Sequence, residues 1–228
     1  MAQPESPTSE DLSRWQAKAL PAAVTLIGLY STIQPLQSAH GQSLFEASMS
    51  LGFEDRYRYL TITPQDRAQF DTWLRSCETS QDMIFFGVID HRTQSCEGRQ
   101  ALMRNDSKNG VIEIGNILWG PKIARTQIAT EALYLSAKYV FEQLGYRRFE
   151  WKCDALNEPS RRAALRFGFQ FEGIFRQHLI IKGKNRDTAW FAMIDREWPV
   201  LDRAYQAWLA PENFDGAGLQ RKKLKEFL

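Results

Sequence analysis

The hydrophobic and polar positions along the chain predict strands and helices in alternation. Residues 23–36, AVTLIGLYSTIQPL, are rich in β-branched side chains and are typical of a first strand. The apolar segment 82–90, DMIFFGVID, indicates another strand, and residues 98–121 indicate two strands joined by a polar turn at 105–110. In FEWKCDA, residues 149–155, apolar and charged residues alternate, which predicts a strand with one buried face.

Helix signals fall between these strands. Residues 37–48 are compatible with a short helix, and Thr63 is a candidate N-cap before Pro64 at a first helical position. After residue 127 the apolar residues recur at helical spacing as far as Gly145, a typical helix-terminating glycine. The remaining predicted elements are helices over 159–167 and 198–209 and a hairpin over 171–195.

The predicted order of elements is β-α-α-β-β-β-α-β-α-β-β-α. This order lacks the strict alternation of a doubly wound fold, so we expect an α+β domain. Its sheet should be mixed, mostly antiparallel, of about six to seven strands, and flanked by helices. We place this domain at residues 21–200, after a disordered N-terminal arm at 1–20 that is rich in Ser, Pro and Glu. A C-terminal helix and a basic tail, expected to be solvated or frayed, fill residues 201–228.

Composition narrows the class of protein. The length of 228 residues suits one domain, and a net charge of +2 gives no argument for a nucleic acid or an anionic membrane as partner. The polar, acidic N-terminus does not resemble a secretory signal, and its nearest apolar run is too short to span a bilayer. We therefore expect a soluble cytoplasmic protein.

The cysteines and histidines point to no metal centre and no disulfide framework. Three cysteines, far apart and without CxxC spacing, suit free thiols in a reducing compartment. The three histidines show no ligand spacing, so we infer no metal. These residues are Cys77, Cys96 and Cys153, and His40, His91 and His178.

A basic loop leads directly into the long helix at residues 122–146, KIARTQIATEALYLSAKYVFEQLGY. The free N–H groups at a helix N-terminus and the helix dipole favour an anion there. Lys122 and Arg125 add positive charge. Because any strand–loop–helix connection offers such donors, a phosphate site and a plain basic loop both remain open at this point.

Three segments, taken in order and spacing, resemble the GNAT superfamily of acetyl-CoA-dependent N-acetyltransferases. They are ATEA at 129–132, the pattern N-x-x-S…G-F, and FEG at 171–173. The resemblance covers residues 24–199 and is closest to the branch that acetylates the N-termini of ribosomal proteins. The middle pattern consists of Asn157, Ser160, Gly168 and Phe169.

The resemblance implies a loop that binds the pyrophosphate of CoA. The family pattern Q/R-x-x-G-x-G/A falls on Ala124, Gln127 and Ala129, so two of its three positions differ from the family. Main-chain N–H groups do not depend on side-chain identity, and we expect them to make the contact. Gln127 in place of glycine implies either an ordinary φ there or a looser contact with the phosphate. The expected donors are Arg125, Thr126, Gln127, Ile128, Ala129 and Thr130.

The resemblance also implies contacts to the rest of CoA. The strand end at Ile117, Leu118 and Trp119 would pair its backbone with the pantetheine arm. Asn157 would hydrogen-bond the same arm, and Arg162 and Arg166 would reach the phosphates. The residues themselves leave alternatives open, because Trp119 also suits a core, Asn157 a helix cap, and the two arginines a solvated helix face.

For catalysis, the resemblance implies Glu172 beside the thioester as the general base. The neighbours Phe169 and Phe171 would bury this carboxyl in part and raise its pKa. Many family members place a tyrosine where this chain has Ala164, so Ser160 is left to stabilise or protonate the departing thiolate. The alternative is a surface Glu172 and a Ser160 that only caps its helix.

The sequence thus predicts an acetyl-CoA-dependent N-acetyltransferase that acts by direct attack of a primary amine. The amine belongs to a peptide or protein N-terminus or to a small molecule, and the enzyme is a monomer or weak homodimer. Two other functions remain open: a non-catalytic acyl-CoA-binding regulatory domain, and an interaction module without CoA. Departure from the phosphate-loop pattern at Ala124 and Gln127 motivates the first.

Overall fold

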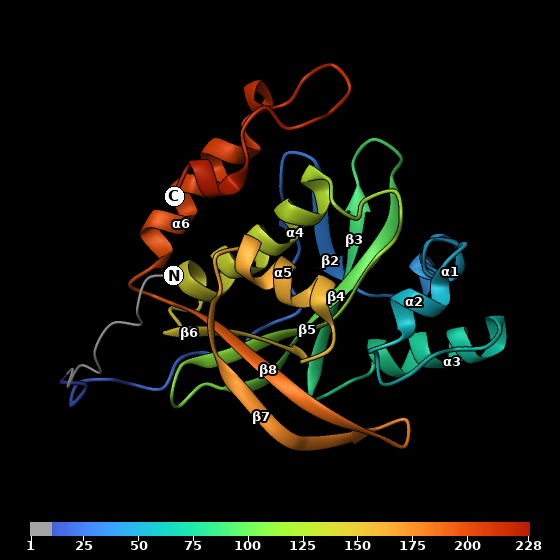
Figure 1. Cartoon of the computed structure of the whole chain (residues 1–228), viewed down its shortest axis with the longest axis horizontal. Helices are drawn as coiled ribbons and strands as arrows, with labels where there is room; N and C mark the ends of the chain where they lie inside the picture. Colours follow the sequence, from blue (N-terminus) through green and yellow to red (C-terminus); the bar gives the residue numbers. More distant parts are fainter. Residues whose placement is uncertain (1–10) are drawn as a thin grey trace.

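The computed structural model describes residues 11–228, which form an eight-stranded sheet with helices on both faces (Figure 1). The strand order is β1-β2-β3-β4-β5-β6-β8-β7, and every neighbouring pair is antiparallel except β5 and β6. The strands are β1 Leu26–Ile27, β2 Ser31–Pro35, β3 Met83–Asp90, β4 Ser95–Asp106, β5 Val111–Trp119, β6 Arg148–Asp154, β7 Gln170–Ile181 and β8 Lys184–Ile194.

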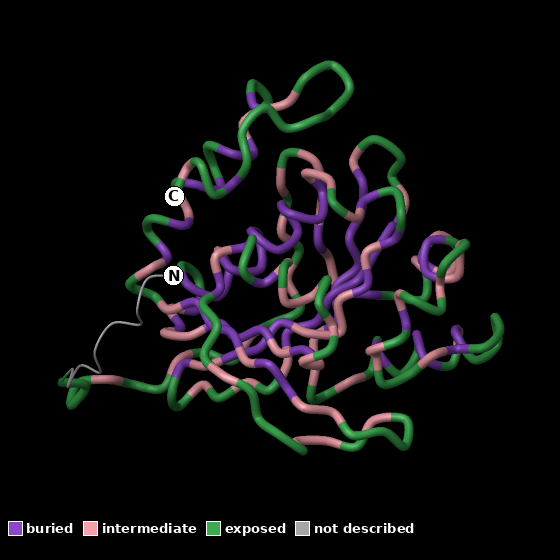
Figure 2. The backbone as a smooth tube through the Cα atoms, in the orientation of Figure 1, coloured by how far each residue is buried: buried purple, intermediate pink, exposed green. Residues whose placement is uncertain are grey.

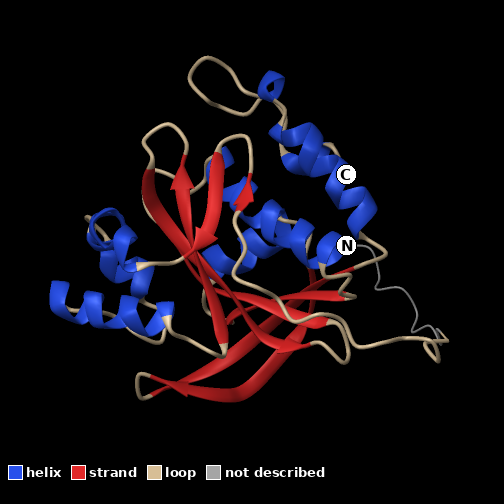
Figure 3. Ribbon diagram, turned by 180° about the vertical axis from the view of Figure 1, so that it is seen from behind, coloured by secondary structure: helices blue, strands red, loops and turns tan. Residues whose placement is uncertain are grey.

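The predicted α+β class is confirmed, while the element order has one more strand and one more helix than predicted and the sheet is larger than the six to seven strands expected. The predicted first strand turns back on itself and contributes both β1 and β2. Figure 3, seen from behind, shows the strongly twisted sheet as one continuous layer.

Within residues 11–228, six α-helices flank the sheet, and their bounds refine the sequence prediction. The third begins after Asp66, whose side chain accepts a hydrogen bond from Gln69 N at 2.8 Å, so Thr63 is not the N-cap. The second helix was not predicted. The helices are α1 Gly41–Met49, α2 Phe53–Tyr57, α3 Arg67–Glu78, α4 Gln127–Lys138, α5 Glu158–Arg166 and α6 Trp198–Leu209.

The two faces of the sheet carry separate apolar cores, shown as buried segments in Figure 2. Along β3, Phe86 and Val88 pack into the larger core with α4, α5 and α6. Phe85 and Ile89 alternate with them and pack with α1 and α3. Because neighbouring side chains of a strand point to opposite faces, α4–α6 cover one face and α1–α3 the other.

Both ends of the described chain are more ordered than the sequence predicts. The first ten residues of the expected arm lie outside the described residues. Beyond them, Trp15 Nε1 donates to Lys108 O at 2.7 Å, and Lys18 N donates to Ser107 O at 3.0 Å. The basic tail also packs, since Leu224 is buried and Trp208 Nε1 donates to Gln220 at 2.9 Å.

A buried carboxylate ties the β1–β2 turn to α4. Glu131 is 3% exposed and accepts hydrogen bonds from the N–H groups of Leu29, Tyr30 and Ser31 at 2.6–2.8 Å. The Ser31 hydroxyl adds a fourth at 2.8 Å. Four donors converge on an acceptor-only group, so every polar atom of this turn that faces α4 is satisfied.

The Glu131→Gln variant is therefore expected to be less stable by about 1–3 kcal/mol, because the amide NH₂ must face backbone donors. For a chain of this size, that lowers Tm by roughly 2–4 °C per kcal/mol. Urea unfolding with an unchanged slope measures the effect. Glu158→Gln, on the exposed start of α5, is the control and should stay within about 0.5 kcal/mol of wild type. Equal midpoints for the Glu131 variant and wild type would contradict this assignment.

Candidate active site

The pairing of β5 with β6 stops before either strand ends. Their parallel register runs from Val111 opposite Arg148 to Ile114 opposite Trp151. Beyond it β5 stays paired with β4 as far as Trp119, and β6 stays paired with β8 to its end. The two strands thus diverge over Gly115–Trp119 and Lys152–Asp154, which we call the split. Its inner edges leave backbone N–H and C=O groups available to an extended ligand.

A β-bulge at Asn116 shapes the β5 side of the split. Between the pairs Ala101–Gly115 and Arg99–Leu118, β5 advances by three residues and β4 by two. Asn116 takes the extra position with φ of 51°. A bulge of this kind bends the strand and re-aims the following residues. Ile117, Leu118 and Trp119, predicted to contact pantetheine, therefore form the β5 edge of the split.

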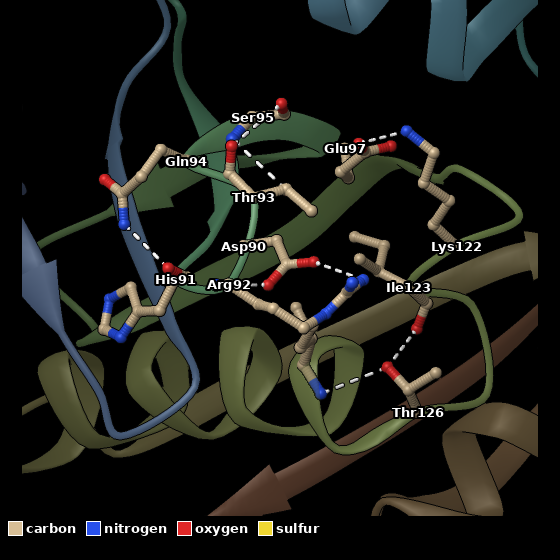
Figure 4. A network of polar contacts seen from close by, with 11 residues as sticks. Asp90, His91, Arg92, Thr93, Gln94, Ser95, Glu97, Lys122, Ile123 and Thr126 are labelled. Atoms are coloured by element: carbon tan, nitrogen blue, oxygen red, sulfur yellow. Dashed lines mark hydrogen bonds and ion pairs between the residues drawn. The ribbon is translucent and has the colours of Figure 1, made fainter. Parts of the chain in front are cut away.

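The loop between β5 and α4 is fastened at both ends (Figure 4). Lys122 Nζ lies 2.7 Å from Glu97 Oε1, a carboxylate whose side chain is 2% exposed. The Thr126 hydroxyl donates to Ile123 O at 2.7 Å and accepts from Ile128 N at 3.2 Å, which makes Thr126 the N-cap of α4. The loop is thus held in one conformation at the helix N-terminus.

Three N–H groups remain for a ligand at this N-terminus, fewer than the six predicted. Ile128 N–H donates to the cap, and the N–H groups of Thr126 and Thr130 bond to Ile123 O and Thr126 O. In the described part of the chain, no acceptor meets the N–H groups of Arg125, Gln127 and Ala129. Unsatisfied N–H groups in the first turn form an anion site.

The strained backbone position of this loop is Arg125 rather than Gln127. Arg125 has φ of 66°, in the left-handed region that favours glycine, whereas Gln127 is the first residue of α4 and has no positive φ. Gln127 thus replaces a family glycine without backbone strain, as predicted.

Helix α5 borders the split from the α4 side. Asn157 is its N-cap and accepts from Ser160 N at 3.2 Å. Ser160 Oγ accepts from Trp151 Nε1 at 3.0 Å, where the pairing of β6 with β5 ends. Burial raises the pKa of the nearby Cys153 thiol, and the Ser160 hydroxyl partly offsets this effect. Asn157 and Ser160 thus act as caps and also lie beside the split.

Only one of the two predicted phosphate-binding arginines is brought to α4. Arg166 Nη1 donates to Thr130 Oγ1 at 3.1 Å, in the first turn of that helix. Arg162 points away, with a side chain 66% exposed, and lies 3.4 Å from Glu158.

Trp119 packs edge-to-face on Phe167, with ring centroids 5.9 Å apart, so it also has the core role considered for it.

The structure separates Glu172 from Ser160, contrary to the expectation that both face one cleft. Both oxygens of Glu172 are held by Arg148 at 2.6–2.7 Å, and Arg148 is the first residue of β6, away from the split. Trp151 and Ser160 lie on the α4–α6 face, whereas Arg148 alternates to the other face. Glu172 is also exposed, on the edge strand β7, so the predicted burial by Phe169 and Phe171 does not occur.

A buried ion cluster lies where the pairing of β5 and β6 ends. The sequence did not predict this cluster. Lys152 Nζ lies 2.6 Å from Glu150 and 3.0 Å from Glu113, and all three side chains are at most 11% exposed. Arg104 lies 3.2 Å from Glu113, and the Trp190 ring lies 3.7 Å from Lys152 Nζ. The charged face of β6 is therefore buried, although its alternation predicted a solvated face.

The carboxyl of Glu113 has the electrostatics of a base. Burial raises its pKa, and the charges of Lys152 and Arg104 offset this only in part. Its neighbours Ile112 and Ile114 belong to the α4 core, so Glu113 faces α1–α3. Its Oε1 lies 3.5 Å from the position of a Cβ built on Gly115, the first residue of the split. A buried carboxyl with a raised pKa is the usual form of a general base.

Neither a metal site nor a membrane-spanning helix is found among residues 11–228. No group of three His, Cys, Asp or Glu side chains there is arranged to hold a metal ion. None of the helices in that range combines the length and apolar character needed to cross a bilayer. The three cysteines are free, as predicted. All three are also buried, and burial raises the pKa of Cys77 and of Cys96 to about 12.

Comparisons with known proteins agree with this geometry. A family model described as an acetyltransferase (GNAT) domain matches residues 32–170. A crystal structure of an N-acetyltransferase of this superfamily from Brucella melitensis is 55% identical, with a TM-score of 0.93 over 95% of this chain and 99% of that one. The uncharacterized N-acetyltransferase p20 of Bacillus licheniformis is 31% identical over 117 residues, and these span 50% of this chain and 63% of p20.

A further similar structure is Mycobacterium smegmatis RimJ, solved in complex with CoA-disulfide. It is 18% identical, with a TM-score of 0.63 over 78% of this chain and 90% of that one. At this level of identity, the comparison shows only that the two proteins share a fold.

Proposed function

The chain belongs to the GNAT acetyltransferase family, and we propose that it transfers an acetyl group from acetyl-CoA directly to a primary amine at the split between β5 and β6. The observation that carries the proposal is the early end of the β5–β6 pairing next to the capped N-terminus of α4. These features offer a backbone edge for an extended arm and N–H donors for a phosphate.

The residues around the split fit a CoA thioester. The N–H groups of Arg125, Gln127 and Ala129 suit the pyrophosphate, and Arg166 adds a charge near the same helix turn. The β5 edge from Ile117 to Trp119 suits the pantetheine arm, with the Asn157 amide on the opposite side of the split. CoA supplies the thioester, and the protein supplies its position.

In the proposed reaction the amine nitrogen attacks the thioester carbonyl carbon. A C–N bond forms, the C–S bond breaks, and Glu113 takes the proton that the amine loses. Ser160, on the opposite face of the split, stabilises or protonates the departing thiolate. Lys152 and Arg104 pair with Glu113, and Arg148 pairs with Glu172, so ion pairing does not distinguish the two carboxylates. Glu113 replaces Glu172 in this assignment because it is buried beside the split and has a raised pKa, whereas Glu172 is exposed on the edge strand.

The energetics of deprotonation favour an amine of low pKa. At pH 7, neutralising an α-amino group costs about 1 kcal/mol, whereas a lysine amine costs roughly 4–5 kcal/mol from its reference pKa. One carboxylate base is therefore better matched to a peptide N-terminus or a small-molecule amine than to a protein lysine. Free thiols of raised pKa suit the proposed cytoplasmic location.

A panel assay tests the proposal. Acetyl-CoA is incubated with peptides of free N-terminus and with small amines, and thiol release is followed together with the product mass. Release that depends on the amine, with an acetylated product, is the expected result. If calorimetry detects acetyl-CoA binding but no amine releases thiol, the chain is a non-catalytic acyl-CoA-binding domain. If acetyl-CoA does not bind, the CoA-independent interaction module is favoured.

A further inference from the structure

Arg99 is a buried cation that has no carboxylate partner among residues 11–228. It lies on β4 and is 2% exposed, with its guanidinium carbon 4.3 Å from the centre of the Trp73 ring. Nη1 donates to the bulge carbonyl, Asn116 O, at 2.6 Å. Among the described residues, no acidic side chain forms an ion pair with Arg99, and its Nε has no hydrogen-bond partner. A buried guanidinium left in this state is unfavourable.

Apart from Asn116 O, the polar groups beside Arg99 are the Tyr57 hydroxyl and the Cys77 thiol. The Tyr57 hydroxyl is buried and acts as a hydrogen-bonding neighbour that raises the pKa of Arg99, and no acceptor for its own proton is found among the described residues. Burial lowers the pKa of Arg99, and Tyr57 and the Cys77 thiol offset this in part. Arginine remains charged under such shifts. A cation and a phenol that both seek an acceptor define a place for an acceptor-only anion such as a carboxylate.

Arg99 shares a face of the sheet with the proposed base. Glu113 lies opposite Met103 on β4, four residues after Arg99 in the strand, which puts the Cα atoms of Arg99 and Met103 roughly 13 Å apart. The floor between them consists of Ala101 and Gly115, a pair of small residues, and the flexible side chain of Met103 covers Gly115. Movement of Met103 off this floor would open space between Glu113 and Arg99 for the body of an acceptor.

We propose that Arg99 binds a carboxylate of the acceptor, so that the substrate is an amine that also carries a carboxylate. The inference rests on the proposed acetyl transfer and deepens it. The amine faces Glu113 at the split, and the carboxylate occupies the buried donors of Arg99 and Tyr57. A free amino acid and an acidic peptide share this chemistry.

The acceptor reaches Arg99 past Tyr57, which is 1% exposed and belongs to the short helix α2. Lys182, at the β7–β8 turn, fixes α2 over Arg99 by donating hydrogen bonds to Tyr57 O at 3.0 Å and to Thr63 Oγ1 at 2.7 Å. Binding of the carboxylate displaces the Tyr57 ring and provides a partner for its hydroxyl.

Matched pairs of ligands test the inference by equilibrium binding. Calorimetry compares β-alanine with β-alaninamide, and C-terminally amidated glycyl-glutamate with C-terminally amidated glycyl-glutamine, with and without desulfo-CoA. The carboxylate form of at least one pair is expected to bind about 10–100-fold more tightly, which is the effect of a charge-assisted pair. A preference in the first pair identifies an amino acid as acceptor, and one in the second an acidic peptide. Equal binding within both pairs overturns the inference.

The Arg99→Met variant is expected to lose this preference while keeping the fold. Methionine retains an unbranched chain against Trp73 and removes the unpaired charge, so Tm should stay level or rise. Tyr57→Phe should weaken binding of the carboxylate form about 3–10-fold. The control is Arg92→Met, a side chain 76% exposed beside Asp90, which should leave the preference intact. A preference that survives Arg99→Met, or a Tm lowered by more than about 5 °C, overturns the assignment.

The two proposals fail separately. Binding of the carboxylate form needs no turnover, so a preference without acetylation supports the Arg99 site and contradicts acetyl transfer. Acetylation of amide and carboxylate forms at equal kcat/KM supports acetyl transfer and contradicts the Arg99 site.

Discussion

The Glu113→Gln variant is expected to lose kcat by about 10²–10⁴-fold, the usual contribution of a general base. The fold and the affinity for acetyl-CoA should be retained, because glutamine has the same shape and Lys152 keeps its ion pair with Glu150 at 2.6 Å. Steady-state kinetics with an amine from the panel, and calorimetry with acetyl-CoA, measure the two effects separately.

The pH dependence of kcat/KM gives the same variant a second readout. A base works in its deprotonated form, so the rate falls as pH drops through the pKa of Glu113. Because burial raises this pKa, the acidic limb lies above the ordinary range of a glutamate. Glutamine does not titrate, so Glu113→Gln should abolish this limb. A limb that persists in the variant belongs to another group.

Glu172→Gln is the matched control, and it also tests the expectation from sequence. Its ion pair with Arg148 lies on an exposed edge, where such pairs contribute little. We expect the kcat of this variant to stay within about twofold of wild type, because a small change in activation free energy changes a rate by only a small factor. If Glu172→Gln loses kcat by the amount assigned to Glu113 while Glu113→Gln does not, the base is Glu172.

The Gln127→Pro variant is expected to weaken binding of CoA by about 10–100-fold, the effect of one hydrogen bond to a charged group. Proline at the first position of a helix removes an N–H that the helix does not use. Thr126 already has φ of −106° and ψ of 176°, which is the conformation preferred before proline. The fold should therefore tolerate the change, and calorimetry with CoA measures the loss.

Gln127→Ala provides the comparison for this loop. It keeps the N–H and removes only the side chain, so CoA affinity should change by less than about threefold. If both variants bind CoA like wild type, the N–H group of residue 127 does not contact phosphate. A far-UV spectrum equal to wild type shows that α4 is intact in each variant.

The sequence predicted the order of elements because apolar periodicity is a local property. Helix α6 begins at Trp198 and ends at Leu209 as predicted, and the alternation in FEWKCDA correctly located β6. The error at Thr63 arose because a following proline favours a helix start, whereas the Asp66 side chain caps Gln69 N in the fold. Local signals thus fixed the kind of element more reliably than its ends.

The site was harder to predict because it depends on strand pairing. Glu113 lies between two isoleucines, and Lys152 lies in an alternating strand, so each residue alone indicates only a polar strand face. They meet because β5 and β6 are parallel neighbours with Glu113 opposite Glu150. The register also separates Glu172 from Ser160, which the resemblance placed together. The available signal was a charged residue within an apolar strand. This signal alone could not locate the site, because the neighbouring strand was not known from the sequence.

Hydrogen–deuterium exchange, measured with and without acetyl-CoA, tests whether the acyl donor lies in the split between β5 and β6 with its pyrophosphate at the N-terminus of α4. We expect slower exchange in peptides that cover Ile117–Trp119 and Arg125–Thr130, with little change over the β7–β8 hairpin. Slower exchange confined to other segments, or no slowing at saturating acetyl-CoA, would contradict this placement of the acyl donor.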